Sequence, residues 1–416
     1  MISTLRQKYT ALYGKSVNVE EMDNRFLSLV EAHKALFGKD KPMIFSAAGR
    51  TEIAGNHTDH NLGLVIGAAI NLDTIAAASR RDDTVINFYS EGFPKCSIDF
   101  SDDEIKKDEI NTTASLLRGI AKAFKDRGFE IKGWDANVTS RVLRGSGLSS
   151  SASVEVLIAE IFNALYAEDA LSPVELAKIG QYAENVYFGK PSGLLDQLSC
   201  AYGGIIGIDF ENKTEPKVEA LSFDFSDYDL EMVITDTRGC HADLTDEYAA
   251  VPPEMRQIAH VYGKENLREV DFDAFIKDLS AIRERVKNDR AILRAYHFFK
   301  ENERVRYMLN DLKQGDIDTF LYNVTESGNS SFRFLQNVYP SSCPKEQGVS
   351  LAIALSEEIL DGEGAVRVHG GGFAGTIQAY VPKRLISRYV EGMENLFGKG
   401  CTTIISIRSL PVARIY

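Results

Sequence analysis

The sequence predicts an α+β protein built in two parts. Strand and helix patterns alternate along all 416 residues, without internal repeats or low-complexity tracts. A polar run at residues 211–217 lies near the middle of the chain, where a boundary between two domains is expected. We therefore expect one domain over residues 1–210 and a second over residues 211–416.

Apolar periodicity identifies the individual elements. Large apolar side chains that recur every three or four residues predict helices at 20–37, 113–127, 153–166, 173–188, 271–325 and 350–360. Short apolar or alternating runs predict strands at 43–48, 64–72, 74–79, 135–141, 203–210, 230–235, 366–369 and 402–409. The first strand is expected to end at Gly49, and the runs 64–72 and 74–79 to form two paired strands.

Composition excludes several classes of protein. The formal charge of −13 argues against a broad nucleic-acid surface, which needs clustered lysine and arginine. The five cysteines lie far apart and lack CxxC spacing, so neither a disulfide framework nor a zinc site is expected. No stretch approaches the roughly 18 apolar residues that a membrane span needs. We expect a cytoplasmic protein with reduced thiols that contacts neither membrane nor nucleic acid.

A glycine- and serine-rich segment lies between a predicted strand and a predicted helix. Residues 145–152 read Gly-Ser-Gly-Leu-Ser-Ser-Ser-Ala. Glycines let the backbone approach an anion, and the first N–H groups of a helix favour phosphate. The segment lacks the Gly-Lys-Ser/Thr ending of a Walker A loop. Taken alone, it is equally typical of a turn with a serine helix cap.

Two further segments carry concentrated polar or glycine-rich sequence. Residues 48–61 place Arg, Glu, Asn, His and Asp between two apolar runs, a combination that can bind a polyol or form a capped turn with a local ion pair. Residues 369–376 hold four glycines within six positions after a predicted strand. This indicates close approach to a ligand or, when the segment is taken alone, a tight structural turn.

Together, and in this order, the three segments resemble the motifs of the GHMP sugar and metabolite kinase superfamily. Within it the chain is most similar to the galactokinase family. Two further blocks support the resemblance, namely Glu184, Gly189, Pro191, Gly193, Asp196 and Gln197, and the stretch from Asp236 to Tyr248. The likeness extends from about residue 40 to about residue 385. It implies an N-terminal mixed-sheet domain like domain 2 of ribosomal protein S5, a C-terminal ferredoxin-like α+β domain, and an active site in the cleft between them.

The resemblance also implies roles for individual residues. Asp196 would accept or orient the proton of the attacking sugar hydroxyl, and Arg50 would keep that carboxylate ionised. Mg²⁺ would be held by Ser151 and Glu184. The ATP triphosphate would lie against Gly145, Ser146, Gly147, Leu148, Ser149, Ser150 and Ser151. The sugar would be bound by Glu52, Asn56, His57, Asp59, Gly193 and Tyr248.

One departure from the family pattern lies at the sugar end. Galactokinases usually carry Asn at the position of Glu52, and Glu, which contacts the sugar's C6 hydroxyl, at the position of Asn56. Either Glu52 restores the carboxylate in a rearranged network, or the C6 group that is recognised differs. Galactose 1-kinase activity is therefore the first hypothesis, and galacturonate or N-acetylgalactosamine 1-kinase activity the second. A sugar sensor that binds ATP and galactose without catalysis is a third. The resemblance favours a monomer whose ligands are a small sugar and ATP.

Overall fold

A large mixed sheet forms the first of two layers of strands. The computed structural model describes residues 1–143, 147–239 and 244–416. The strands of the large sheet follow the order β12-β1-β2-β5-β3-β4, and in addition β6 pairs with β2 and β7 pairs with β6. They are β1 (Met43–Ala54), β2 (Leu64–Arg80), β3 (Val85–Ser90), β4 (Cys96–Asp99), β5 (Trp134–Ser140), β6 (Ile205–Asp209), β7 (Lys217–Leu221) and β12 (Ala413–Arg414). β3 and β5 pair in parallel and the remaining pairs are antiparallel.

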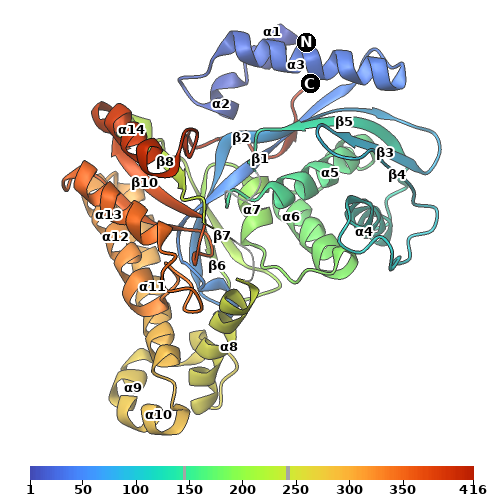
Figure 1. Cartoon of the computed structure of the whole chain (residues 1–416). Helices are drawn as coiled ribbons and strands as arrows, with labels where there is room; N and C mark the ends of the chain where they lie inside the picture. Colours follow the sequence, from blue (N-terminus) through green and yellow to red (C-terminus); the bar gives the residue numbers. More distant parts are fainter. Residues whose placement is uncertain (144–146, 240–243) are drawn as a thin grey trace.

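Helices cover both faces of this sheet (Figure 1). Side chains of a strand point alternately to its two faces, so Ile75 and Ala77 of β2 pack with the N-terminal helices, and Ala76 and Ala78 with the opposite group. The N-terminal group is α1 (Ile2–Arg6), α2 (Tyr9–Tyr13) and α3 (Val19–Phe37). The opposite group is α4 (Thr113–Asp126), α5 (Ser150–Tyr166), α6 (Pro173–Tyr182), the π-helical turn η2 (Ala183–Phe188) and α7 (Leu195–Tyr202).

The two central strands are longer than the sequence pattern predicts. β1 does not end at Gly49 but runs to Ala54, because its polar residues from 50 to 52 are buried against neighbouring elements. The expectation of two strands over 64–72 and 74–79 is also wrong, since β2 is one strand of 17 residues. The buried Asp73 in its middle does not break it, because Arg25 donates to this carboxylate at 2.6 Å. Arg408 adds a second buried cation 3.7 Å away.

The second sheet is antiparallel and has the order β11-β8-β10-β9. Its strands are β8 (Leu230–Asp236), β9 (Ala365–His369), β10 (Thr376–Pro382) and β11 (Thr402–Ile405). One face packs on α13 (Gly348–Leu360) and α14 (Ile386–Phe397), and the other packs on α11 (Asp289–Gln314) and α12 (Ile317–Ser330). α8 (Thr245–Val261), α9 (Phe272–Lys277) and α10 (Leu279–Val286) extend beyond the sheet at the far end of α11 (Figure 1).

The chain crosses between the two layers more than once. β7 pairs with β6, so the division at residue 210 falls inside a hairpin of the large sheet. After β11 the chain returns to the large sheet, where β12 pairs with β1 and the two termini lie close together (Figure 1). The two-domain division at 210/211 stays a proposal, and strand pairing favours placing β7 and β12 with the first domain. Within the described residues, no helix is both long and apolar enough to cross a membrane.

Candidate active site

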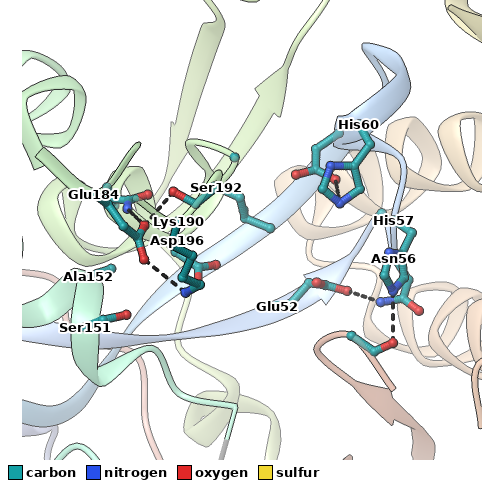
Figure 2. Close-up of a pocket in the computed structure, with 16 residues that line it drawn as sticks. Glu52, Asn56, His57, His60, Ser151, Ala152, Glu184, Lys190, Ser192 and Asp196 are labelled. Atoms are coloured by element: carbon teal, nitrogen blue, oxygen red, sulfur yellow. Dashed lines mark hydrogen bonds and ion pairs between the residues drawn. The ribbon is translucent and has the colours of Figure 1, made fainter. Parts of the chain in front are cut away.

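A cavity of about 180 Å³ lies where the end of β1, the start of α5, the η2–α7 loop and the turn after β9 meet. Figure 2 shows its labelled side chains in two groups, with Glu184, Lys190, Ser192 and Asp196 on one side and Glu52, Asn56, His57 and His60 on the other. The lining residues are Glu52, Gly55, Asn56, His57, Asp59, His60, Ser151, Ala152, Glu184, Lys190, Ser192, Gly193, Leu195, Asp196, Gln197 and Gly371. Residues predicted from four separate sequence segments therefore share one cavity.

The Arg50–Asp196 pair is the most sharply defined feature of the site. Arg50, on β1, donates from Nε to Asp196 Oδ1 at 2.8 Å and from Nη2 to Oδ2 at 3.0 Å. This two-point geometry fixes the carboxylate in one orientation. Burial opposes ionisation of Asp196, but the Arg50 charge and hydrogen bonds outweigh it and lower the pKa of this carboxyl below its usual value. The pair thus presents an ionised, oriented carboxylate at the cavity.

The glycine- and serine-rich segment at residues 145–152, which we call the phosphate loop after its predicted role, is joined to this pair through its described residues by hydrogen bonds. The Leu148 carbonyl accepts from the Arg50 N–H at 3.0 Å, the Gly147 carbonyl accepts from Arg50 Nη1, and the Ser149 hydroxyl donates to Asp196. Gly147 has φ +70° and Ser149 has φ +55°, so the chain turns sharply into α5. The first N–H groups of α5, from Ser150 onward, have no partner within the helix and can bind an anion.

Two predicted members of the loop, Gly145 and Ser146, lie outside the described residues. The described part of the loop is therefore Gly147, Leu148, Ser149, Ser150 and Ser151. Of these, Ser151 lines the cavity and is exposed.

The residues predicted to bind Mg²⁺ fit a hard cation. Ser151 and Glu184 offer oxygen ligands to the same cavity, and Mg²⁺ typically combines one or two protein oxygens with phosphate oxygens and water. Beside them, Glu155 Oε1 and Gln197 Oε1 are buried acceptors without a donor among the described residues. Burial, together with the nearby Glu184, raises the pKa of Glu155 to about 8. At neutral pH the Glu155 carboxyl is therefore protonated and uncharged, so the predicted cation ligands remain Ser151 and Glu184.

Glu184 is already oriented by three neighbours. Its Oε1 accepts from Lys190 Nζ at 3.0 Å, and its Oε2 accepts from Ser192 Oγ at 2.5 Å and from Gln197 Nε2 at 2.9 Å. Neither Lys190 nor Ser192 was predicted from the sequence to be a site residue. Position 190 lies between the motif residues Gly189 and Pro191, and only the fold shows that its side chain turns back to Glu184.

At the sugar end, three predicted residues form a compact group. Asp59 and Gly193 lie so close that a Cβ on Gly193 would be 2.7 Å from Asp59 Oδ2. Only glycine leaves room for the carboxylate at this position. His57, at φ +59°, bonds from Nε2 to the Gly371 carbonyl at 2.9 Å. Burial and the nearby His60 lower the pKa of His57 to about 4, so it is neutral and donates from Nε2.

The exchanged residues Glu52 and Asn56 contact each other directly. Asn56 donates from Nδ2 to Glu52 Oε1 at 2.9 Å (Figure 2). The same Nδ2 also donates to the Gly370 carbonyl at 2.6 Å. Its Oδ1 accepts from Asn337 Nδ2 at 2.6 Å. The Asn56 amide is therefore engaged by the protein on every side, and Asn56 is only 1% exposed. Asn56 therefore lies in the cavity wall and links β1 to the turn after β9 and to Asn337.

Glu52, by contrast, has one oxygen anchored. Its Oε1 accepts from Asn56 and forms an ion pair with Arg367 Nη2 at 3.4 Å. Burial raises the pKa of Glu52, while the Arg367 and Arg50 charges favour its ionised form. With Oε1 held in this way and the side chain lining the cavity, the carboxylate is placed for hydrogen bonding to a ligand.

Tyr248 does not line the cavity. Its hydroxyl donates to the Gly372 carbonyl at 2.8 Å, and its ring packs edge-on against Phe373 with 5.2 Å between ring centroids. A Cβ on Gly371 would lie 2.4 Å from the Tyr248 ring. In this arrangement Tyr248 supports the glycine-rich turn from behind.

His369 is the first residue of the glycine-rich segment at residues 369–376, and it connects this segment to β1. This buried residue bonds from Nε2 to Thr51 Oγ1 and from Nδ1 to Thr376 Oγ1, both at 3.0 Å. Burial and the nearby Arg50 hold the pKa of His369 well below its usual value, so it is neutral. It ties the second sheet to the strand that carries Arg50 and Glu52. No role was predicted for it, because a histidine at the end of a strand carries no distinct sequence signal.

Comparison with known proteins agrees with this geometry. Residues 115–204 match the family model described as the GHMP kinases N terminal domain. Residues 31–80 match the model described as the galactokinase galactose-binding signature. A galactokinase from Streptococcus suis is 30% identical over 395 residues, covering 94% of this chain and 95% of its own length. The chain belongs to the galactokinase family.

Other members of the galactokinase family extend the likeness. A galactokinase from Streptomyces coelicolor is 29% identical over 371 residues, which cover 88% of this chain and 92% of that protein. The crystal structure of Lactococcus lactis galactokinase complexed with galactose superposes with a TM-score of 0.77 at 24% identity, covering 94% of this chain and 99% of that one. Methanococcus jannaschii mevalonate kinase superposes with a TM-score of 0.63 at 13% identity, covering 89% and 99%. The GHMP kinase fold expected from the sequence is confirmed.

Proposed function

We propose that the chain is an ATP-dependent galactose 1-kinase, which converts ATP and galactose to ADP and galactose 1-phosphate. Membership of the galactokinase family supports this proposal. The observation that carries it is the Arg50–Asp196 pair, because it presents an oriented carboxylate to the same cavity as the phosphate loop, with Arg50 Nε 2.8 Å from Asp196 Oδ1. Phosphoryl transfer requires mainly positioning and charge neutralisation, which this arrangement supplies.

In the proposed reaction, the anomeric hydroxyl of the sugar hydrogen-bonds to Asp196. The hydroxyl oxygen forms a bond to the γ-phosphorus, the bond from that phosphorus to the β–γ bridging oxygen breaks, and the proton passes to Asp196. Because Arg50 lowers the basicity of Asp196, the carboxylate mainly orients the hydroxyl and takes the proton as the new bond forms. Bound Mg²⁺, held through Ser151 and Glu184, would neutralise charge on the β- and γ-phosphates.

The sugar end favours galactose over a uronic acid. Glu52 places a carboxylate at the cavity with Oε1 fixed by Asn56 at 2.9 Å. A carboxylate accepts hydrogen bonds, so it suits a sugar hydroxyl and repels a second carboxylate on the ligand. This supports the first of the two interpretations of the Glu52/Asn56 exchange, in which Glu52 replaces the family's usual carboxylate.

An ADP-release assay across galactose, galacturonate, N-acetylgalactosamine and glucose tests the proposal. We expect turnover with galactose and none with galacturonate. Preference for galacturonate or N-acetylgalactosamine would overturn the sugar assignment. ATP and galactose binding without ADP release from any of the four sugars would overturn the kinase assignment and identify a sensor.

We also propose a monomer that works in the cytoplasm. The described cysteines, Cys96, Cys200, Cys343 and Cys401, are all free, which supports a reducing compartment. Sedimentation equilibrium at micromolar concentration tests the oligomeric state, and a mass of twice 46.1 kDa would contradict the monomer.

A further inference from the structure

Lys190 occupies a defined position above the predicted metal-binding carboxylate. The π-helical turn η2 ends at Phe188, and Gly189 follows it at φ +87°. The N–H groups of Gly189 and Lys190 both donate to the Glu184 carbonyl, at 3.0 and 3.1 Å. These bonds turn the chain back on itself, so that the Lys190 side chain passes over the Glu184 side chain. Its Nζ then lies 3.0 Å from Glu184 Oε1 (Figure 2).

The charges around the cavity are unevenly matched. Its described lining residues include four carboxylates and a single lysine or arginine, which is Lys190. Two of these carboxylates pair with arginines that do not line the cavity, namely Asp196 with Arg50 and Glu52 with Arg367. Among the described lining residues, Lys190 is therefore the one lysine or arginine that a triphosphate in this cavity would contact. Lysine binds phosphate groups as a mobile point charge.

Glu184 does not depend on Lys190 for its orientation. Its Oε2 keeps two donors, Ser192 Oγ at 2.5 Å and Gln197 Nε2 at 2.9 Å, after Lys190 leaves. The Glu184 side chain is 5% exposed, whereas the Lys190 side chain is 59% exposed. The lysine can therefore change partner by rotating a flexible, solvated stem while the carboxylate stays in place.

We propose that Lys190 is a further substrate-binding residue, whose ammonium pairs with Glu184 in the empty site and contacts the terminal phosphate of ATP in the loaded site. This inference rests on the proposed kinase function. The terminal phosphate is the expected contact because Lys190 shares its cavity with Asp196, where the phosphate is transferred. The competing role is that of a latch, in which the ion pair with Glu184 holds the 189–193 loop and touches no ligand.

Calorimetric titration of Lys190→Met with a non-hydrolysable ATP analogue and with ADP, both with Mg²⁺, separates these roles. In Lys190→Met the terminal phosphate loses a charge-assisted hydrogen bond. The affinity for the triphosphate analogue should therefore fall about tenfold or more. ADP affinity should change by less than about twofold to threefold, within the scatter of surface substitutions. Lys190→Arg keeps the charge and should restore at least part of the triphosphate affinity. The matched control is Lys34→Met, which removes an exposed ion pair with Asp40 at 2.8 Å on α3.

The melting temperature of Lys190→Met should stay close to that of the wild type, because Glu184 keeps its other donors. Equal affinity of Lys190→Met and the wild type for the triphosphate analogue would overturn the proposal. So would an equal loss for both nucleotides accompanied by a lower melting temperature, which is the signature of a latch. Failure of the wild-type protein to bind either nucleotide would instead contradict the kinase function itself.

Discussion

The phosphate end and the sugar end of the cavity are built differently. The phosphate end is built from β1, α5, η2 and α7, which all pack with the large sheet. They carry Arg50, the helix-capping Ser149, Glu184 and Asp196, respectively. At the sugar end, the segment from residue 52 to residue 57 bonds to the second layer at several polar groups. Asn56 donates to the Gly370 carbonyl at 2.6 Å, and Arg367 donates to the Ile53 carbonyl at 2.7 Å.

This difference has a consequence for mutation. A polar change at the phosphate end removes a local interaction and leaves the packing between the two layers intact. A change at the sugar end also removes a bond between the layers, so sugar affinity and stability should fall together. The two ends can therefore be distinguished by whether a loss of activity is accompanied by a loss of stability.

The largest effect is expected from Asp196→Asn. The amide cannot take the proton, and general-base catalysis contributes about 10²- to 10⁴-fold, so kcat should fall within that range. The ATP affinity should change little. The buried Arg50 keeps the asparagine oxygen and the Gly147 carbonyl as acceptors, and the side chain at position 196 is 37% exposed, so the melting temperature should fall by less than when a fully buried ion pair is broken. Steady-state kinetics and calorimetry measure both, with Asp82→Asn, at a fully exposed carboxylate, as the control. Transfer at nearly the wild-type rate would show that Asp196 is not the base.

At the sugar end, Glu52→Gln should lower kcat/KM for galactose by about 10- to 100-fold, the worth of a hydrogen bond to a charged acceptor. Because the buried Arg367 loses its partner, stability should fall as well. Comparison with 6-deoxygalactose isolates the contact, since only galactose loses a bond to Glu52. The preference for galactose over its 6-deoxy analogue should shrink in the variant.

Glu254→Gln is the matched control for that experiment. Glu254 pairs with the fully buried Arg294 at 2.8 Å, away from the cavity. It should lower the melting temperature without changing the preference for galactose. If Glu52→Gln lost activity equally toward both sugars, Glu52 would be a support for the fold and not a contact for the sugar. The double exchange Glu52→Asn with Asn56→Glu restores the family's usual order and should retain more activity than either single change.

A smaller effect is expected from Gly193→Ala. The new methyl group would lie 2.7 Å from Asp59 Oδ2, so the carboxylate must move away from its position. A displaced hydrogen bond to a sugar hydroxyl should raise KM for galactose about tenfold. KM for ATP should stay unchanged, because Gly193 lies at the sugar end. An unchanged KM for galactose would mean that Asp59 is not in contact with the sugar.

The cavity-lining residues of the phosphate end, Ser151, Glu184 and Asp196, could be identified from the sequence because they belong to short motifs. Leu148, Ser149 and Ser150 stand at the start of a helix, a position whose free N–H groups favour an anion. Asp196 belongs to a block that ends in a helix, and its spacing from Glu184 is set by one short loop. The motifs identify these residues, but the Arg50–Asp196 and Ser149–Asp196 hydrogen bonds join segments 146 and 47 residues apart and are seen only in the fold.

The sugar end required the fold because its contacts join distant segments. No spacing in the sequence shows that the Asn56 amide hydrogen-bonds to Gly370 and Asn337, which lie more than 280 residues further along the chain. Nor does it show that Tyr248 donates to the Gly372 carbonyl. The extension of β1 to Ala54 was missed for the same reason, since Thr51 and Glu52 are buried against His369 and Arg367 of the second layer.

The smallest effect is expected from Tyr248→Phe, which tests the support role directly. The substitution removes one hydrogen bond of 2.8 Å to the Gly372 carbonyl and keeps the ring against Phe373. The free energy of unfolding should fall by about 1 kcal/mol, the usual net value of such a bond. Because the hydroxyl faces the turn and not the cavity, KM for galactose should change by less than about threefold. Chemical denaturation and steady-state kinetics give the two quantities, and a large rise in KM at unchanged stability would place the hydroxyl on the sugar instead.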